Sequence, residues 1–164
     1  MERLGRGDGA QPADLRVYAK QRLALGLAYT LPGTPVVYYG DEVGLSGRRD
    51  PDARRPMPAE SALTADMRGV RDFVTRLAKL RDCSGALRRG TYRTISASAE
   101  VLAFARELEG AAPAIVVVTR SPGAPPSGIL QAGWVDLLTG RTGTETMGPL
   151  EIAIFQPSSS ACAH

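Results

Sequence analysis

The chain has 164 residues, with 20 Lys or Arg against 17 Asp or Glu and a formal net charge of +3. This length suits one modest domain or two small ones. So balanced a charge excludes the basic surface typical of nucleic-acid binding. No run of about 18 apolar residues is present, so the sequence predicts no membrane span.

A helix followed by a short strand is predicted near the start of the chain. Residues 1–12 are rich in glycine and charge and predict a loop. Apolar residues at helical spacing predict a helix over residues 14–30, which Pro32 and Gly33 end. The apolar, β-branched and aromatic residues 34–39 then predict a buried strand.

A long loop and a second helix come next. Residues 40–63 are rich in Gly, Pro, Asp and Arg, and loops longer than about 12–15 residues in compact domains are usually functional or disordered. An apolar stripe at helical spacing predicts a helix over residues 64–81. We expect a domain boundary between residues 82 and 83.

In the rest of the chain the apolar residues alternate, and Gly and Pro turn signals separate the apolar runs. Short strands at this spacing predict a small antiparallel β-sandwich over residues 83–157. Residues 158–164 predict a disordered tail. The expected strands are Thr91–Ser96, Glu100–Arg106, Ala114–Arg120, Trp134–Leu138 and Leu150–Gln156.

The two cysteines, Cys83 and Cys162, lack the spacing of a metal site, and no histidine lies near Cys83. Cys83 is expected to be a small apolar filler at the end of the second helix, and Cys162 falls in the tail. A disulfide between them is the alternative. The sequence predicts no metal site and no cofactor.

Asp50 and Arg54 stand four residues apart in the long loop, with Pro51 stiffening the turn between them. A carboxylate accepts hydrogen bonds from two neighbouring hydroxyls, and a guanidinium donates a fork of two. These groups therefore suit the recognition of sugar hydroxyls. The alternative is a plain Asp–Arg ion pair that closes a solvated loop.

The segment 31–44, together with Asp50-Pro-Asp-Ala-Arg54, resembles the eighth strand and following loop of the α-amylase family of glycoside hydrolases. The family pattern Gly-x-Pro-x-x-x-Tyr-Gly-x-Glu is matched from Gly33 to Glu42. A departure follows, because relatives commonly have a tryptophan where Ala59 stands. A weaker resemblance, which includes residues 134–140, extends to about residue 157.

This resemblance implies an α/β part followed by an all-β part. Residues 1–82 are expected to be the last strand and flanking helices of a TIM (β/α)8 barrel, and residues 83–157 the C-terminal β-sandwich. The chain is too short for a whole barrel, which needs roughly 200–250 residues. We therefore expect Met1 to be an internal methionine of a longer bacterial enzyme.

The resemblance also implies roles for individual residues. Asp50 and Arg54 are expected to contact glucose, with Tyr39, Gly40 and Glu42 in supporting positions. The family's catalytic carboxylates belong to barrel strands that this chain lacks and to a segment before the first helix, so no catalytic residue is assigned. Trp134 is expected to pack between sheet and loop, with sugar stacking as the alternative.

The sequence therefore predicts a C-terminal segment of a retaining α-glycosidase or glucanotransferase that acts on α-glucans or maltooligosaccharides and is inactive alone. A non-catalytic carbohydrate-binding module and an assembly module remain alternatives. The missing barrel segment or a second copy are the expected protein partners. The chain indicates neither localisation nor calcium use by the parent enzyme. We expect residues 1–82 to be the less ordered half, because a lone barrel strand has two unpaired edges.

Overall fold

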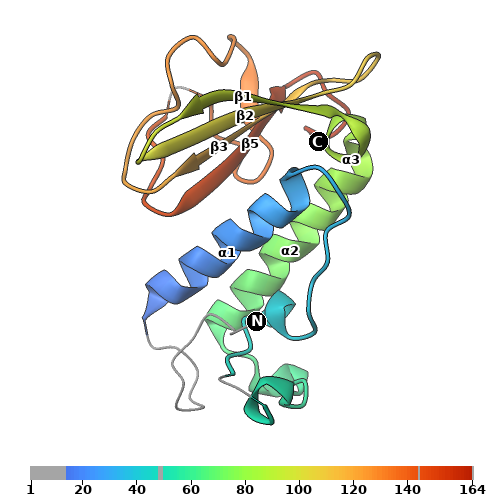
Figure 1. The fold of residues 1–164 in the computed structure, drawn as a ribbon, viewed down its shortest axis with the longest axis vertical. Coiled ribbons are helices and arrows are strands. Elements are labelled where there is room, and N and C mark those ends of the chain that lie inside the picture. The colour runs from blue at the N-terminus through green and yellow to red at the C-terminus, as the bar shows by residue number, and fades with distance from the viewer. Residues whose placement is uncertain (1–13, 48–49, 144, 164) are drawn as a thin grey trace.

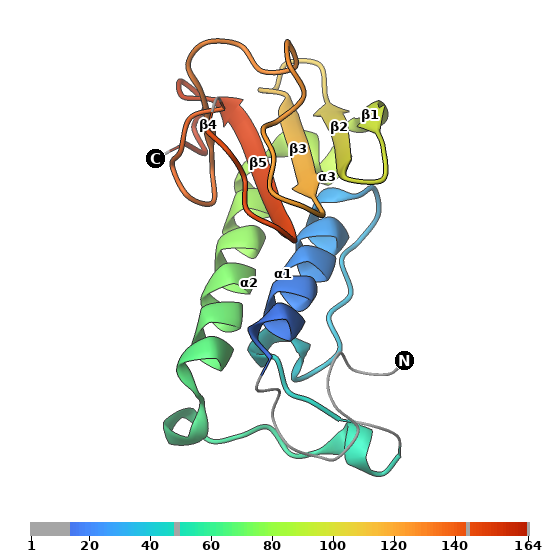
Figure 2. The ribbon, with the colours of Figure 1, turned by 90° about the vertical axis from the view of Figure 1, so that its left-hand side faces the viewer.

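In the computed structural model, which describes residues 14–47, 50–143 and 145–163, two long helices lie against one face of an antiparallel sheet (Figure 1). The helices pack side by side and extend well beyond the sheet (Figures 1 and 2). No helix in these ranges is long and apolar enough to cross a membrane.

Both long helices begin where a side chain can cap them. Helix α1 (Leu15–Thr30) begins after Asp14, whose carboxylate accepts a hydrogen bond from the Arg16 N–H at 2.9 Å. Helix α2 (Ala65–Cys83) begins after Thr64, whose hydroxyl accepts from the Met67 N–H at 3.2 Å. Such bonds satisfy main-chain donors that the first helical turn leaves unpaired. Both predicted helices are confirmed, with ends within two residues of those expected.

Four shorter helical turns were not predicted. Ser84 caps α3 (Gly85–Arg89) by accepting from the Leu87 N–H at 3.3 Å. The long loop contains three 3-10 turns, η1 (Asp41–Val43), η2 (Asp52–Arg54) and η3 (Glu60–Ala62).

The five predicted strands are present, with ends shifted by at most two residues. They form one sheet of order β1-β2-β3-β5-β4, with antiparallel neighbours throughout. The expected second sheet of a sandwich is absent from the described ranges. The strands are β1 (Thr91–Ala97), β2 (Val101–Glu107), β3 (Ala114–Thr119), β4 (Trp134–Asp136) and β5 (Glu151–Pro157).

A single sheet suffices because both of its faces are covered. On one face Phe104, Val116 and Ile154 join a core with apolar residues of α1 and α2. On the other face the sheet packs against residues of the connecting loops, including Met147 and Leu130. Alternate strand residues point to opposite faces, so the same strands supply both cores. The helices and loops therefore take the place of a second sheet.

Residues 34–39, expected to be a buried strand, belong to no strand: residues 34–38 have no regular secondary structure and Tyr39 lies in a turn. We call this stretch the extended segment because its backbone leaves α1 without coiling (Figure 1). Val37 packs against the core, whereas Val36 is 86% exposed. A ladder needs a neighbouring strand, and the part of the chain that the structure describes places none beside this segment. Gly33 and Gly40, with φ of 108° and 89°, bracket it at turns that favour glycine.

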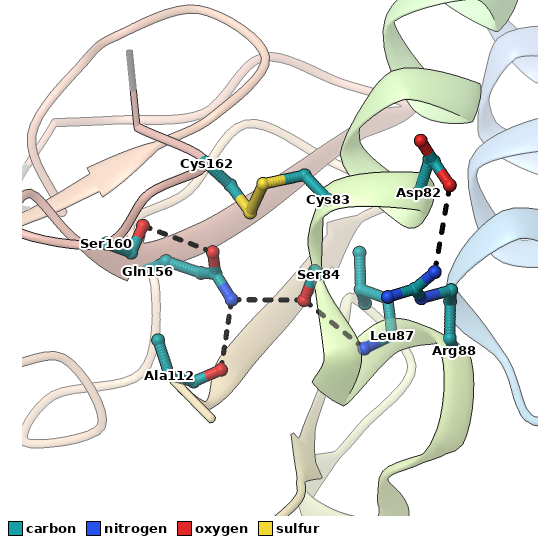
Figure 3. Close-up of a disulfide and its surroundings, with 9 residues drawn as sticks. All are labelled: Asp82, Cys83, Ser84, Leu87, Arg88, Ala112, Gln156, Ser160 and Cys162. Atoms are coloured by element: carbon teal, nitrogen blue, oxygen red, sulfur yellow. Dashed lines mark hydrogen bonds and ion pairs between the residues drawn. A yellow bond between two sulfur atoms is a disulfide. The ribbon is translucent and has the colours of Figure 1, made fainter. Parts of the chain in front are cut away.

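Cys83 and Cys162 form a disulfide, so the expectation of an unpaired Cys83 is wrong and the alternative is correct. Their Cα atoms lie 5.8 Å apart, although 79 positions separate the residues in the sequence. Because Cys83 ends α2, the bridge joins this helix to the chain's last residues (Figure 3).

A hydrogen-bond network beside the disulfide also anchors the C-terminal residues, which were expected to be disordered. The Gln156 amide nitrogen donates to the Ser84 hydroxyl at 3.2 Å and to the Ala112 carbonyl at 3.1 Å. The amide oxygen of Gln156 accepts from the Ser160 hydroxyl at 3.3 Å (Figure 3). Ser160 is buried and Cys162 is bonded to Cys83, so residues 158–163 are attached to the fold at two points, whereas residue 164 of the expected tail lies outside the described residues.

Candidate functional site

Asp50 and Arg54 form an exposed, forked ion pair. Arg54 Nε donates to Asp50 Oδ1 at 3.0 Å, and Arg54 Nη2 donates to Asp50 Oδ2 at 2.7 Å. The two side chains are 65% and 64% exposed, with Arg54 on η2. The hydrogen bond and charge of Asp50 raise the pKa of Arg54 above its ordinary value. Three of the five guanidinium N–H groups are not used by this pair, so the fork can donate further hydrogen bonds.

Tyr39 joins this loop to the extended segment before it. Its hydroxyl donates to the Arg55 carbonyl oxygen at 3.1 Å, and Arg55 in turn pairs with Asp52 at 2.5 Å. The rings of Tyr38 and Tyr39 have centroids 4.8 Å apart, and both side chains are more than a third exposed. Aromatic surface therefore lies near the exposed fork.

Gly40 and Glu42 lie at the end of the extended segment. Gly40 precedes η1, and its carbonyl oxygen accepts from the Val43 and Leu45 N–H groups at 3.2 and 2.8 Å. Glu42 is within η1, and its Oε2 atom is buried without a hydrogen-bond partner among the described residues. No hydrogen bond or ion pair in the described ranges joins Glu42 to the Asp50–Arg54 fork. The five expected site residues are therefore close in sequence. Of the three supporting residues, Tyr39 is hydrogen-bonded to the loop that carries the fork.

The chemical capacity of this surface is hydrogen bonding. An exposed carboxylate–guanidinium fork beside aromatic rings can accept and donate to hydroxyls while the rings cover apolar C–H groups. Across the described residues, no group of three or more His, Cys, Asp or Glu is arranged to hold a metal ion.

Two buried arginines near this segment were missed by the sequence analysis. Arg81 and Arg106 are 9% and 1% exposed, and both donate to main-chain carbonyls around the end of α1. The sequence did carry a signal, because Arg106 alternates on the same strand face as Leu102 and Phe104. Arg81 likewise follows Leu77 at helical spacing along the apolar stripe. A charged residue at an apolar position indicates a buried partner.

Trp134 is buried in the second core, as expected from the packing interpretation. It is 9% exposed and contacts apolar residues such as Met147 and Phe155. Trp134 also lines a cavity of about 510 Å³ between the loops after β3 and β4. Two residues on, Asp136 is fully buried and its Oδ1 accepts from the Ile154 N–H at 3.0 Å. The segment 134–140 is therefore structural in this fold.

No protein-family model matches this chain, but known proteins are similar to it over most of its length. Neopullulanase 2 of Thermoactinomyces vulgaris is 35% identical over 144 residues, which are 83% of this chain and 24% of that protein. Cyclomaltodextrinase of Thermoanaerobacter pseudethanolicus is 38% identical over 103 residues, 63% of this chain and 17% of that protein. The chain thus spans about a quarter or less of these two relatives, and it matches their C-terminal region.

Solved structures of amylases also resemble this chain. An α-amylase from Anoxybacillus has a TM-score of 0.71 with 25% identity, covering 88% of this chain and 34% of that one. AmyP in complex with maltose has a TM-score of 0.73 over 92% of this chain and 37% of its own. At 22% identity the likeness to AmyP shows the fold alone.

Proposed function

Because this chain is homologous to the C-terminal part of α-amylase-family glycoside hydrolases, we propose that it serves an enzyme acting on α-glucans and that its Asp50–Arg54 loop contacts the sugar. The relatives' names, neopullulanase and cyclomaltodextrinase, support α-1,4-linked glucose oligomers as the substrate class. In this proposal Tyr39, Gly40 and Glu42 support the loop.

The observation that carries the proposal is the exposed fork on a loop that the partly exposed Tyr39 holds by a hydrogen bond. Arg54 keeps three N–H groups beyond those used in the fork, so the loop can donate to a ligand without breaking the ion pair. Tyr39 fixes the loop through its bond to the Arg55 carbonyl oxygen, which lowers the entropic cost of ordering the fork around a ligand. Glucose units offer both a ring of hydroxyls and an apolar face, and this surface can bind both.

The same proposal predicts that the 164-residue chain alone does not hydrolyse α-glucans. A retaining glycosidase uses two carboxyl groups roughly 5–5.5 Å apart, one as nucleophile and one as acid/base. Asp50 is engaged by Arg54, and Asp52 by Arg55. In the family the catalytic carboxylates come from segments outside the region that resembles this chain. Substrate contact and catalysis are therefore separable in this proposal.

Calorimetric titration of the purified chain with maltotriose tests the proposal. Saturable binding that is lost in both Asp50→Asn and Arg54→Gln supports it. Arg93→Gln is a matched control, because Arg93 forms a similar exposed fork with Glu107 on the sheet, at 3.2 and 2.6 Å. The control should bind like the unchanged protein. Equal binding by all three variants refutes sugar contact by the Asp50–Arg54 loop. Release of reducing sugar by the chain alone refutes its predicted inactivity.

An assembly role is the second candidate, favoured by the distribution of exposed apolar side chains. Among described residues, four of the five large hydrophobic side chains that are strongly exposed lie between residues 36 and 57. Apolar surface gathered in one segment is typical of an interaction site. A chain that binds no maltotriose but self-associates, with association lost in Val36→Asp, would favour assembly. The four are Val36, Tyr38, Tyr39 and Met57.

A further inference from the structure

Helix α1 ends beside the start of the extended segment, and its last carbonyl oxygens need partners. The final turn of any helix leaves four carbonyl groups without intrahelical donors. Here the Leu31 N–H returns to the Leu27 oxygen at 2.9 Å, and the chain then turns through Gly33 into residues 34–39. The oxygens of Tyr29, Thr30 and Gly33 all accept side-chain hydrogen bonds instead.

The donors are two guanidinium groups that reach the same place from different elements. Arg81, in the last turns of α2, donates from Nη1 to the Tyr29 oxygen at 2.6 Å and from Nη2 to the Gly33 oxygen. Arg106, on β2, donates from Nη1 to the Thr30 oxygen. A helix and the sheet are thus both bonded to the end of α1.

Arg106 also links this point to the start of the sheet. Its Nη2 donates to the Gly90 oxygen at 2.9 Å, and its Nε donates to the Thr91 oxygen at 3.3 Å. One planar fork therefore connects the end of α1 with the connection between α3 and β1. Lysine cannot replace it, because a single ammonium group lacks three donors spread along a rigid plane.

The two charges are compensated by main-chain dipoles. Burial lowers the pKa of both arginines, and the charge of Arg81 further lowers the pKa of Arg106. Neither forms an ion pair with a carboxylate in the part of the chain that the structure describes. The negative end of the α1 dipole and its carbonyl oxygens stabilise both charges. Moving the end of α1 away would remove the Tyr29 and Thr30 oxygens from two buried guanidinium groups, which is costly.

The extended segment is thus held firmly at its beginning and attached again at its far end. Arg81 holds Gly33, and Tyr39 bonds to the loop that carries the Asp50–Arg54 fork. Between these points, residues 34–38 have no ladder that could fix their position. At the far end Val43 and Leu45 are buried in the core, so the two arginines fix where the segment begins and the core fixes where it ends.

We propose that Arg81 and Arg106 are positioning residues for the Asp50–Arg54 loop, and that through Arg106 the C-terminal sheet sets the geometry of the sugar-contacting surface. This inference rests on the proposed function for its sugar readout. The conformational part, that the two arginines fix the segment leading to the loop, stands independently of what the loop binds.

Hydrogen–deuterium exchange tests the conformational part. In Arg81→Lys and Arg106→Met we expect exchange of the η1 amides to be about tenfold faster, the effect of losing one net hydrogen bond that holds the segment. Amides of β2, β3 and β5 should change much less in Arg81→Lys. The reporting amides, all hydrogen-bonded, are those of Asp41, Val43, Gly44 and Leu45.

Arg76→Met is the matched control. Arg76 also lies on α2 and also donates to a carbonyl oxygen, that of Leu138 at 3.3 Å, but this bond does not touch the end of α1. The control should leave the η1 amides unchanged. Arg81→Lys keeps the charge and one donor group, so it provides a folded variant if Arg106→Met is too unstable.

Maltotriose titration gives the second readout. If the unchanged chain binds maltotriose, Arg81→Lys should bind about tenfold more weakly, with the Arg76→Met affinity unchanged. If the unchanged chain does not bind, the proposed function fails, and the exchange experiment still decides the positioning role. Exchange of the η1 amides that matches the control, or that rises only in step with every strand, overturns the inference.

Discussion

Reduction of the Cys83–Cys162 disulfide should lower the stability of the folded chain substantially. The bridge joins residues 79 positions apart, so the oxidised unfolded chain contains a large closed loop. In the chain-entropy treatment, opening a loop of this size costs about 4.5 kcal/mol of stability at 25 °C. For a chain of this length each kcal/mol corresponds to about 2–4 °C in Tm, which gives an expected decrease of about 9–18 °C.

The assay is thermal unfolding followed by circular dichroism, with and without a phosphine reductant. A Cys83→Ala/Cys162→Ala variant measured without reductant should show a similar decrease, because it also lacks the cross-link. Thiol titration supplies the chemical control, with no free thiol expected before reduction and both cysteines titrating afterwards. Exchange should also rise at the amide of Ser160, which bonds to the Pro157 oxygen at 2.9 Å.

The reasoning is refuted by either of two results. Free thiols in the protein purified under oxidising conditions would mean that the two cysteines do not meet. A decrease in Tm below about 2 °C on full reduction would mean that the neighbouring network of Gln156, Ser84 and Ser160 holds the C-terminal residues without the bridge.

Three further changes test the packing and electrostatics of the sheet. Phe104→Ala, which empties a fully buried site, should lower the free energy of unfolding by about 3–5 kcal/mol in urea, and Tyr92→Ala, at a 40% exposed neighbour, by less. Asp136→Ala should cost about 3–5 kcal/mol in the same assay, since it removes one carboxylate from the largely buried Arg141 and leaves the N–H groups of Leu138 and Ile154 without this acceptor. The hydrogen bond from Arg93 lowers the pKa of Glu107 below its ordinary 4.5. The stability that ionised Glu107 contributes is therefore present at neutral pH and is lost as the pH falls below about 4.5 through the folded-state pKa. Glu107→Gln should therefore flatten the acid side of a stability–pH profile, and an unchanged slope would contradict this assignment.

Local signals in the sequence predicted most of the secondary structure. Thr64 caps α2, and Gly33 ends the turn after α1, so the ends of both helices were predictable from single residues. Alternation predicted each strand within two residues. The short helix α3 was missed because Ser84 and Gly85 serve equally well as a turn or as the start of a helix.

Features that depend on long-range contact were not predictable in the same way. The disulfide joins positions 79 residues apart, and spacing carries no information on such proximity. Alternation predicts strands but not how many sheets they form, so the covering of the second face by loops could not be anticipated. The roles of Asp50 and Arg54 came from resemblance. The structure supplies their forked geometry, and only the titrations can test the sugar contact.

The extended segment 34–39 has the residue pattern of a strand but no neighbouring strand to pair with. Its β-branched and aromatic residues favour a strand, but the structure contains no ladder here and a turn includes Tyr39. Val37 packs inward while Val36 faces out, so the alternation of a strand survives without its hydrogen bonds. The segment keeps this form because Arg81 and Tyr39 hold its two ends.

Helix α1 shows why the expected disorder of residues 1–82 does not follow from unpaired strand edges alone. The second half of the helix is apolar nearly all round, and the sheet covers part of that surface, with Ile152 of β5 close enough to contact Gly26. Leu25 and Tyr18 join the core shared with α2. One continuous core thus runs from both helices into the sheet, so loosening the helices would also uncover the sheet's inner face. We therefore expect hydrogen exchange to protect α1 and α2 nearly as strongly as β3, and residues 34–37 to exchange faster than either helix. Fast exchange across both helices with a protected sheet would show instead that the sheet folds without them.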